Sequence, residues 1–168
     1  MKSLAKEELA QLLAVAARHD AKDALMLRVA FNHGLRVSEV LALTGENIVD
    51  GHLVVQRLKN SNLTSQPLLA DEKEGIDQLV RDGGRFFPIS RTTAHRRMQR
   101  YGAEAGIPKF KRHMHVLKHT CGRLGYKGGM GIPELVTYLG HKNPGNSLKY
   151  MEADEAQAAA AFAAAVGK

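Results

Sequence analysis

The stretch over residues 48–55 most restricts the folds open to this chain. Two short apolar runs rich in β-branched residues flank Asp50-Gly51. An Asp-Gly pair between such runs is the strongest short-range signal for a β-hairpin. The second strand is expected to continue to Lys59, and a third strand is expected over 63–69. The pattern predicts a small three-stranded antiparallel sheet with Lys59 at the tip of its second hairpin.

Helical spacing of apolar residues governs the rest of the chain. Expected helices cover 4–17, 21–32, 36–43, 72–82, 90–105, 115–124 and 133–139, followed by a short helix that presents Tyr150 and an Ala-rich tail over 153–166. No repeat of fixed period and no low-complexity linker divides the chain. The sequence therefore predicts one domain over 1–168, of the α+β class and mainly α-helical.

Residues at the expected helix ends support these boundaries. Gly34 is expected to stop the second helix, and Asp71 is expected to cap the helix that starts at 72. Pro133 is expected at the first position of its helix, where the missing amide costs nothing. Tyr126 is expected in a Gly-rich connection just before that helix.

Positive charge is concentrated in the middle of the chain. The net charge is +8 over residues 81–119, against +7 for all 168 residues. Such a patch indicates a polyanion partner such as nucleic acid, although a solvated helix face explains charge alone equally well. The residues expected to bind DNA, mostly through phosphates, are Arg91, Arg96, Arg97 and Arg100 on the exposed side of one helix, with Lys111 and Arg112 after it.

Other features narrow the class of protein. The single cysteine, Cys121, excludes an internal disulfide and fits a reducing cytosol. The N-terminus lacks the apolar core of a signal peptide, and the longest apolar run is too short to cross a bilayer. The expectation is a cytoplasmic, nucleoid-associated protein without a membrane contact.

Six side chains have the chemistry that a protein nucleophile needs to cleave a phosphodiester. Fixed cations and N–H donors must surround the phosphate, an oxygen must attack in line, and an acid must protonate the departing sugar oxygen. These functions are available from Arg36, Lys59, His115, Lys118, His141 and Tyr150. Glu39, one helical turn after Arg36, is placed to hold its guanidinium.

The same residues fall into an ordered set of motifs. The set consists of Gly34-Leu-Arg36-Val-Ser-Glu39-Val-Leu-Ala-Leu43, Arg57-Leu-Lys59-Asn, His115-Val-Leu-Lys118-His119-Thr120, Leu139-Gly140-His141 and, nine residues later, Tyr150. In this order the motifs resemble those of the tyrosine recombinases, or phage integrases. The resemblance extends from the opening helix through Tyr150, and the ordered set is far more specific than any of its parts.

The resemblance implies the catalytic domain of a site-specific DNA recombinase from a phage or other mobile element. Such an enzyme cuts one DNA strand through a 3′-phosphotyrosyl intermediate, and a 5′-hydroxyl then reverses the attack. It needs no metal and no cofactor. The implied roles are nucleophile for Tyr150, phosphate grip for Arg36, acid for Lys59, proton handling or phosphate orientation for His115, phosphate hydrogen bonding for His141, and support of Arg36 by Glu39.

The resemblance also implies partners. Double-stranded DNA is the expected substrate, with a monomer when free and an oligomer of up to four copies on DNA. The tail over 153–166, with Phe162 as its one large anchor, is expected either to pack on its own domain or to dock in trans on a neighbouring copy.

Two departures from the family pattern leave alternatives open. Lys118 stands where the family usually has arginine, and a lysine offers a hydrated point charge in place of a bidentate fork, so activity is expected to be reduced or differently tuned. Met1 begins almost at the catalytic domain, without the usual N-terminal DNA-binding domain, as in a fragment, a minimal enzyme or a remnant. The alternative functions are a catalytically weakened DNA-binding module of the same fold and a type IB topoisomerase-like relaxing enzyme.

Some of these residues also have simpler interpretations. His115 and His119 have the i, i+4 spacing of a helical metal pair, but no acidic or thiol ligand stands near them. A metal site is therefore disfavoured, and His119 is expected to be a core histidine that bonds its own helix. By chemistry alone Tyr126, Tyr138 and Tyr150 are all candidate nucleophiles, but Tyr138 is expected in the core and Tyr126 in a Gly-rich loop. The resemblance implies Tyr150, which alone follows His141 at the distance usual for the family.

Overall fold

The computed structural model describes residues 3–58, 61–151 and 155–167. The helices are α1 Lys6–His19, α2 Ala21–Asn32, α3 Val37–Leu41, α4 Ala70–Asp82, α5 Arg91–Glu104, α6 His115–Lys127, α7 Ile132–Leu139, α8 Gly145–Leu148 and α9 Glu155–Ala165. The strands are β1 Ile48–Val49, β2 His52–Gln56 and β3 Leu63–Pro67. Helices predominate over one small sheet, so the predicted α+β, mainly α-helical class is confirmed.

The sheet is antiparallel in the order β1-β2-β3. Asp50 and Gly51 both have positive φ, as a two-residue hairpin turn requires, and Val49 pairs with His52 across it. β2 is shorter than predicted, because its ladder with β3 ends where Gln56 pairs with Leu63. The predicted place of Lys59 at the hairpin tip lies outside the described residues.

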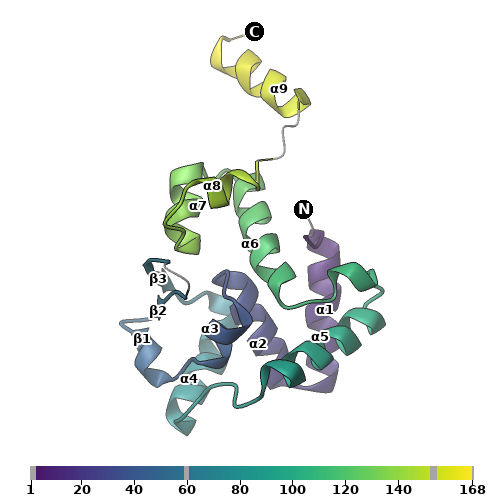
Figure 1. Cartoon of the computed structure of the whole chain (residues 1–168), viewed down its shortest axis with the longest axis vertical. Coiled ribbons are helices and arrows are strands. Elements are labelled where there is room, and N and C mark those ends of the chain that lie inside the picture. The colour runs from purple at the N-terminus through teal and green to yellow at the C-terminus, as the bar shows by residue number, and fades with distance from the viewer. Residues whose placement is uncertain (1–2, 59–60, 152–154, 168) are drawn as a thin grey trace.

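Most helices gather around one main core, and a smaller second core lies beyond it. In Figure 1, α6 runs from the main body toward α7 and α8, which form a separate small layer. The second core consists of Leu135, Leu139 and Tyr150, all almost fully buried. Helix α9 stands apart from the rest of the molecule, and the side chain of its Phe162 is exposed.

A buried hydrogen-bond network fixes the turn between α2 and α3. The imidazole of His33 lies 2.7 Å from Gln66 Oε1 of β3 and 2.6 Å from Glu72 Oε1 of α4. The amide nitrogen of Gln66 donates in turn to the carbonyl of Tyr138 in α7. The network therefore joins four elements at the point where the chain turns toward Arg36.

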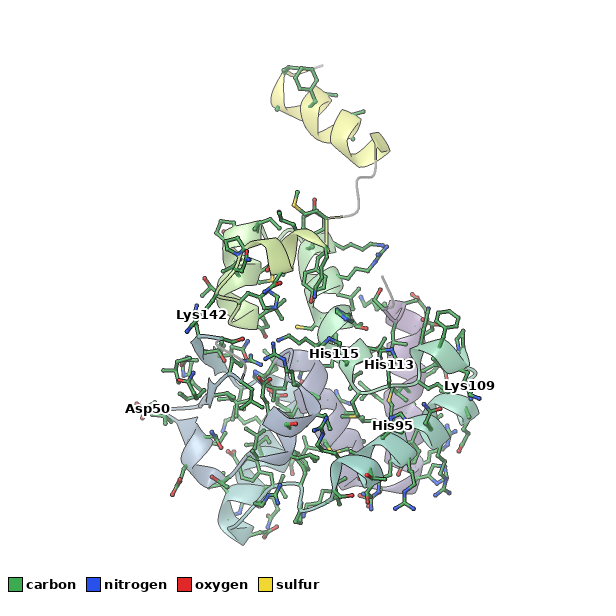
Figure 2. All side chains as sticks on the ribbon, in the orientation of Figure 1. Asp50, His95, Lys109, His113, His115 and Lys142 are labelled. Atoms are coloured by element: carbon green, nitrogen blue, oxygen red, sulfur yellow. The ribbon has the colours of Figure 1, made fainter. Side chains whose placement is uncertain are left out.

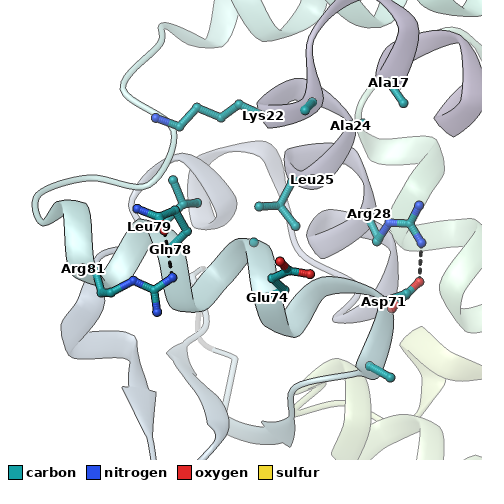
Figure 3. A pocket seen from close by; sticks show the side chains of 13 residues that line it. Ala17, Lys22, Ala24, Leu25, Arg28, Asp71, Glu74, Gln78, Leu79 and Arg81 are labelled. Atoms are coloured by element: carbon teal, nitrogen blue, oxygen red, sulfur yellow. Dashed lines mark hydrogen bonds and ion pairs between the residues drawn. The ribbon is translucent and has the colours of Figure 1, made fainter.

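Several predicted helix ends are wrong in detail. Asp71 does not cap α4, because the helix begins at Ala70 and the carboxylate of Glu72 accepts the N–H of Leu69 instead. Asp71 pairs with Arg28, as Figure 3 shows. Pro133 is the second residue of α7.

Two further boundaries differ from the predictions. α6 continues to Lys127, so Tyr126 lies in a helix and not in a loop. α3 covers only Val37–Leu41, with Arg36 as its N-terminal flanking residue. Gly34, in contrast, has the positive φ expected of a residue that ends a helix, and it comes directly after His33, the C-cap of α2.

Candidate active site

The carboxylate of Glu39 holds Arg36 at the start of α3. Glu39 Oε2 accepts the backbone N–H of Arg36 at 2.7 Å, and Oε1 accepts Arg36 Nη1 at 2.9 Å. Oε1 also accepts the backbone N–H of Leu58 at 3.0 Å, so the same carboxylate ties the end of the β2 segment to α3. The predicted support of Arg36 by Glu39 is present, and about a quarter of the Arg36 side chain faces solvent.

The pKa of Glu39 follows from these contacts. Burial raises it, but the N–H groups of Arg36 and Leu58 and the charges of Arg57 and Lys118 outweigh burial and leave it below its ordinary value. Glu39 is therefore a carboxylate at neutral pH. Its negative charge is enclosed among three cations.

Arg57 is a member of the site that the sequence analysis did not single out. Its side chain is fully buried, and its guanidinium donates to the carbonyls of His33 at 2.6 Å and Gly34 at 3.1 Å. It also donates to Thr64 Oγ1 at 2.8 Å and lies 3.4 Å from Glu39 Oε2. The contacts with His33 and Gly34 join the segment after β2 to the turn that leads into Arg36.

Lys118 is buried on α6 and points at backbone carbonyls. Its Nζ donates to Gly34 at 2.9 Å and to Leu139 at 3.3 Å. Burial lowers the pKa of Lys118 to about 7, and the positive charge of Arg57 adds to this effect. Lys118 thus connects the segment before Arg36 with the segment before His141.

The two predicted histidines lie in different surroundings. His141 is buried, with Nδ1 2.8 Å from Ser147 Oγ of α8, and burial together with the charges of Lys118 and Lys149 lowers its pKa to about 4. His115 is exposed at the first position of α6. Partial desolvation, and then the charges of Lys118 and Lys149, lower its pKa as well. Both rings are therefore mainly neutral at pH 7.

The predicted nucleophile is buried. Tyr150 is 1% exposed, and its ring lies against Gly122 so closely that a Cβ at that position would stand 2.6 Å from Cζ. Its hydroxyl is 3.5 Å from Nδ1 of His119. Burial raises the pKa of Tyr150 well above its usual range. Attack on phosphate therefore requires that the phenol be uncovered.

His119 lies beside Tyr150, which differs from the predicted contact with its own helix. The rings of His115 and His119 are 4.4 Å apart in an edge-on arrangement, and the contact with the Tyr150 hydroxyl follows on the other side. Lys149, with Nζ 5.4 Å from the Tyr150 ring centroid, is a further cation near the nucleophile. Neither residue was singled out as a member of the site.

The structure thus brings five of the six predicted catalytic residues into one region. Lys118 donates to the carbonyls of Gly34 and Leu139, two residues before Arg36 and His141. The ring of His115 contacts that of His119, which in turn contacts the ring of Tyr150. Lys59, the sixth, lies outside the described residues.

The residues expected to bind DNA divide into two groups. Arg91 and Arg96 are exposed, and Arg91 lines a surface hollow together with His95 of α5 and His115. Figure 2 labels His95 and His115, which both line this hollow.

The other predicted contacts are engaged within the chain. Arg97 is half-buried against Asp23, so its predicted place on the exposed side of the helix is wrong. Arg100 lies 3.3 Å from His19, and Lys111 lies 2.8 Å from the carboxylate of Glu8. Arg112 donates to the carbonyl of Ile107 at 2.5 Å. DNA binding by all six residues stays a prediction.

A second surface feature, away from these residues, contains none of the predicted catalytic side chains. A large groove lies between α2 and α4, with an apolar floor that includes Leu25 and a charged rim that includes Arg28 and Asp71 (Figure 3).

Within the described ranges, no group of three or more histidine, cysteine or acidic residues is placed to hold a metal ion. In that same part of the chain, no helix is long and apolar enough to cross a membrane.

Comparison with known proteins decides the family. Residues 2–157 match the model of the phage integrase family. The chain belongs to this family. Its relatives include the type 1 fimbriae regulatory protein FimE of Escherichia coli K12, which is 30% identical over 154 residues that cover 82% of this chain and 77% of FimE. The tyrosine recombinase XerA of Pyrococcus furiosus is 30% identical over 83% of this chain and 53% of its own length.

Solved structures show the same fold. The catalytic domain of bacteriophage HP1 integrase has a TM-score of 0.72 and 24% identity, over 89% of this chain and 86% of that domain. The XerH recombinase bound to its difH substrate has a TM-score of 0.77 and 19% identity, over 94% of this chain. The chain spans about half of the XerH chain, 52%. The family and fold predicted from the ordered motifs are confirmed.

The buried ammonium of Lys118 predicts a pH-dependent contribution to stability. In the unfolded chain a lysine keeps its proton up to a pH of about 10.4, whereas the folded pKa is about 7. Between these values the unfolded state binds more protons, so stability rises with pH. We expect the free energy of unfolding of the wild type, minus that of Lys118→Met, to grow from pH 7 to pH 10 in urea denaturation. Parallel curves for the two proteins would contradict a buried, titrating Lys118.

Proposed function

We propose that this chain is the catalytic domain of a site-specific tyrosine recombinase that breaks and rejoins duplex DNA through Tyr150. The observation that carries the proposal is that Lys118 of α6 donates to the carbonyls of Gly34 and Leu139, each two residues before Arg36 or His141, while His119 of the same helix lies 3.5 Å from the Tyr150 hydroxyl. Family membership supports it independently, since the relatives include proteins named as tyrosine recombinases.

The proposed reaction needs no external energy. The phenol of Tyr150 gives its proton to the neutral ring of His119, 3.5 Å away. The Tyr150 oxygen forms a bond to the scissile phosphorus while the bond to the 5′ oxygen breaks, which leaves a 3′-phosphotyrosyl link. Arg36 and His141 donate hydrogen bonds to the non-bridging oxygens, where negative charge grows. Lys59 gives its proton to the departing 5′ oxygen, and a 5′-hydroxyl later reverses these steps.

Duplex DNA is the proposed substrate. The exposed Arg91 and Arg96, together with the hollow beside His115, give a positive surface next to the catalytic residues. Related structures are described as XerH bound to difH substrate and lambda integrase bound to DNA. Because Tyr150 is shielded in the free chain, we propose that DNA binding at this surface uncovers the phenol. The setting is the cytoplasm, in association with the nucleoid.

We propose that α9 docks on a second copy when the chain is bound to DNA. The helix stands apart from the other elements, and the side chain of Phe162 is 69% exposed (Figure 1). A free monomer and an oligomer of up to four copies on DNA are the corresponding states. An exposed large apolar side chain gains stability when a partner covers it.

Truncation after Ala153 tests this role of α9. The shortened chain is expected to stay monomeric when free and to lose the larger DNA complexes in a native gel, while its single-copy complex remains. Unchanged large complexes would exclude a role of α9 in assembly.

Tyr150→Phe tests the nucleophile. Incubation of the wild type with a nicked suicide DNA site should trap a covalent adduct that is visible on a denaturing gel. Tyr150→Phe should form none, because the phenyl ring packs on Gly122 equally well but has no attacking oxygen.

Tyr126→Phe is the matched control, since Tyr126 is a partly buried tyrosine on α6 that packs against the same small core as Tyr150. It should form adduct at the wild-type level. An adduct that persists in Tyr150→Phe, or a wild type that forms none under any condition, would sink the proposed function.

A DNA-binding module that has lost cleavage is the second candidate. The burial of Tyr150 and the contacts of Lys118 with two carbonyls are the observations that favour it. Salt-sensitive DNA binding by a wild type that forms no adduct would select this function over the first.

A further inference from the structure

Arg57 stands two residues before the proposed acid Lys59, yet it points into the protein. Its side chain has no solvent exposure, and all three of its guanidinium nitrogens have partners. Two of these partners, the carbonyls of His33 and Gly34, belong to the turn that leads into Arg36. An arginine with this many buried bonds fixes backbone position more firmly than packing alone.

Arg57 and Lys118 share one acceptor. The carbonyl oxygen of Gly34 receives Arg57 Nη1 at 3.1 Å and Lys118 Nζ at 2.9 Å. A nearby anion offsets the repulsion between two adjacent buried cations, and the carboxylate of Glu39 lies 3.4 Å from Arg57. The same carboxylate holds Arg36 through two further contacts.

We propose that Arg57 is a positioning residue for strand cleavage. Arg57 and Lys118 together hold the carbonyl of Gly34, and Arg57 also holds the carboxylate of Glu39, a set of contacts that we call the brace. The brace keeps Arg36 in place for the scissile phosphate. This inference rests on the proposed function. It assigns Arg57 no contact with DNA. It assigns Lys118 to the same brace, with two of its N–H groups committed to backbone carbonyls.

The brace explains how a lysine is accommodated at position 118. The lysine at this position donates to two carbonyls with one compact group, and its pKa can fall when it is buried. An arginine at position 118 would place a second, permanently charged guanidinium beside that of Arg57. The charged and titratable groups around Lys118 are Arg57 after β2, Arg36 and Glu39 at the start of α3 and within it, His115, His119 and Cys121 from α6, and His141 after α7. Positive charge dominates this set.

A pH profile separates positioning from a general structural role. The positive charge of Arg57 contributes to the low pKa of Lys118, after burial. A protonated Lys118 favours phosphate in the site, so cleavage is expected to fall as pH rises through the pKa of Lys118 in the DNA complex. Removal of the Arg57 charge raises that pKa and moves the fall to higher pH. Replacement of Arg57 by another cation leaves the fall in place.

The experiment measures single-turnover adduct formation on a suicide DNA site from pH 6 to pH 10. Arg57→Lys should be slower by about tenfold to a hundredfold, because a small misplacement of a phosphate ligand has effects of this size, with the midpoint of the fall unchanged. Arg57→Gln should be slower and have its midpoint at higher pH. Lys118→Met should lose this fall altogether.

Arg85→Gln is the matched control. Arg85 also donates through two nitrogens to one backbone carbonyl, that of Leu41, at 3.1 and 2.6 Å. It stands at the far end of α3 from Arg36, so its loss should change neither the rate at low pH nor the midpoint. Circular dichroism establishes that each variant is folded at the assay temperature.

If Arg57→Gln does not fold, Thr64→Val replaces it. This change removes the acceptor of Arg57 Nε and keeps the charges of Arg57 and Lys118. Adduct formation is therefore expected to be slower, with the midpoint of its fall with pH unchanged.

Wild-type rates in folded Arg57→Lys or Thr64→Val would overturn the inference, and so would an unmoved midpoint in Arg57→Gln. A wild type that forms no adduct is a different outcome, since it removes the proposed function and the cleavage role of Arg57 with it.

Discussion

One buried carboxylate, that of Glu39, holds together the segments on which the site depends. Its two oxygens accept the backbone N–H groups of Arg36 and Leu58 and the guanidinium of Arg36, and the guanidinium of Arg57 lies against it. Removing one partner of a buried pair leaves the other charge uncompensated, at a cost of about 3–5 kcal/mol. α3 and the end of β2 are therefore placed relative to each other by charge as well as by packing.

The same arrangement gives the site its electrostatic character before DNA arrives. Lys118 has a pKa of about 7, and His119 and His141 have pKa values of about 4, because burial and neighbouring cations oppose further positive charge. A phosphate that enters such a region supplies the missing negative charge. Tyr150, whose pKa is raised by burial, has its hydroxyl beside a neutral histidine ring. The site is thus suited to an anion, and its nucleophile is buried.

Local sequence patterns correctly predicted the hairpin, the main helices and the Arg36–Glu39 pair. Asp50-Gly51 forms its hairpin turn, and the helical spacing of apolar residues located each main helix. Arg36 and Glu39 pair as their spacing requires, because that contact lies within one helical turn. Local patterns failed at Asp71, whose carboxylate is taken by Arg28 from α2, a partner 43 positions away.

Contacts between distant segments explain the other differences. Arg57 had no local signal for its role, since its partners come from the turn after α2, from α3 and from β3. The i, i+4 spacing of His115 and His119 agrees with their ring contact on α6, but the contact of His119 with Tyr150 comes from the segment after α8. The basic stretch was predicted as one exposed surface, but Arg97 meets Asp23 and Lys111 meets Glu8, both from the first two helices. Charge counted along a chain does not show which charges are already neutralised in the fold.

The most direct measurement of the central claim is the single-turnover cleavage rate of Glu39→Gln on a suicide DNA site, at a temperature where the variant is folded. An amide lacks the charge and one of the two acceptor oxygens that hold Arg36. The rate is expected to fall by about a hundredfold, the size of effect that a misplaced phosphate ligand produces, while DNA affinity changes little. A folded Glu39→Gln protein that cleaves at the wild-type rate would contradict the account.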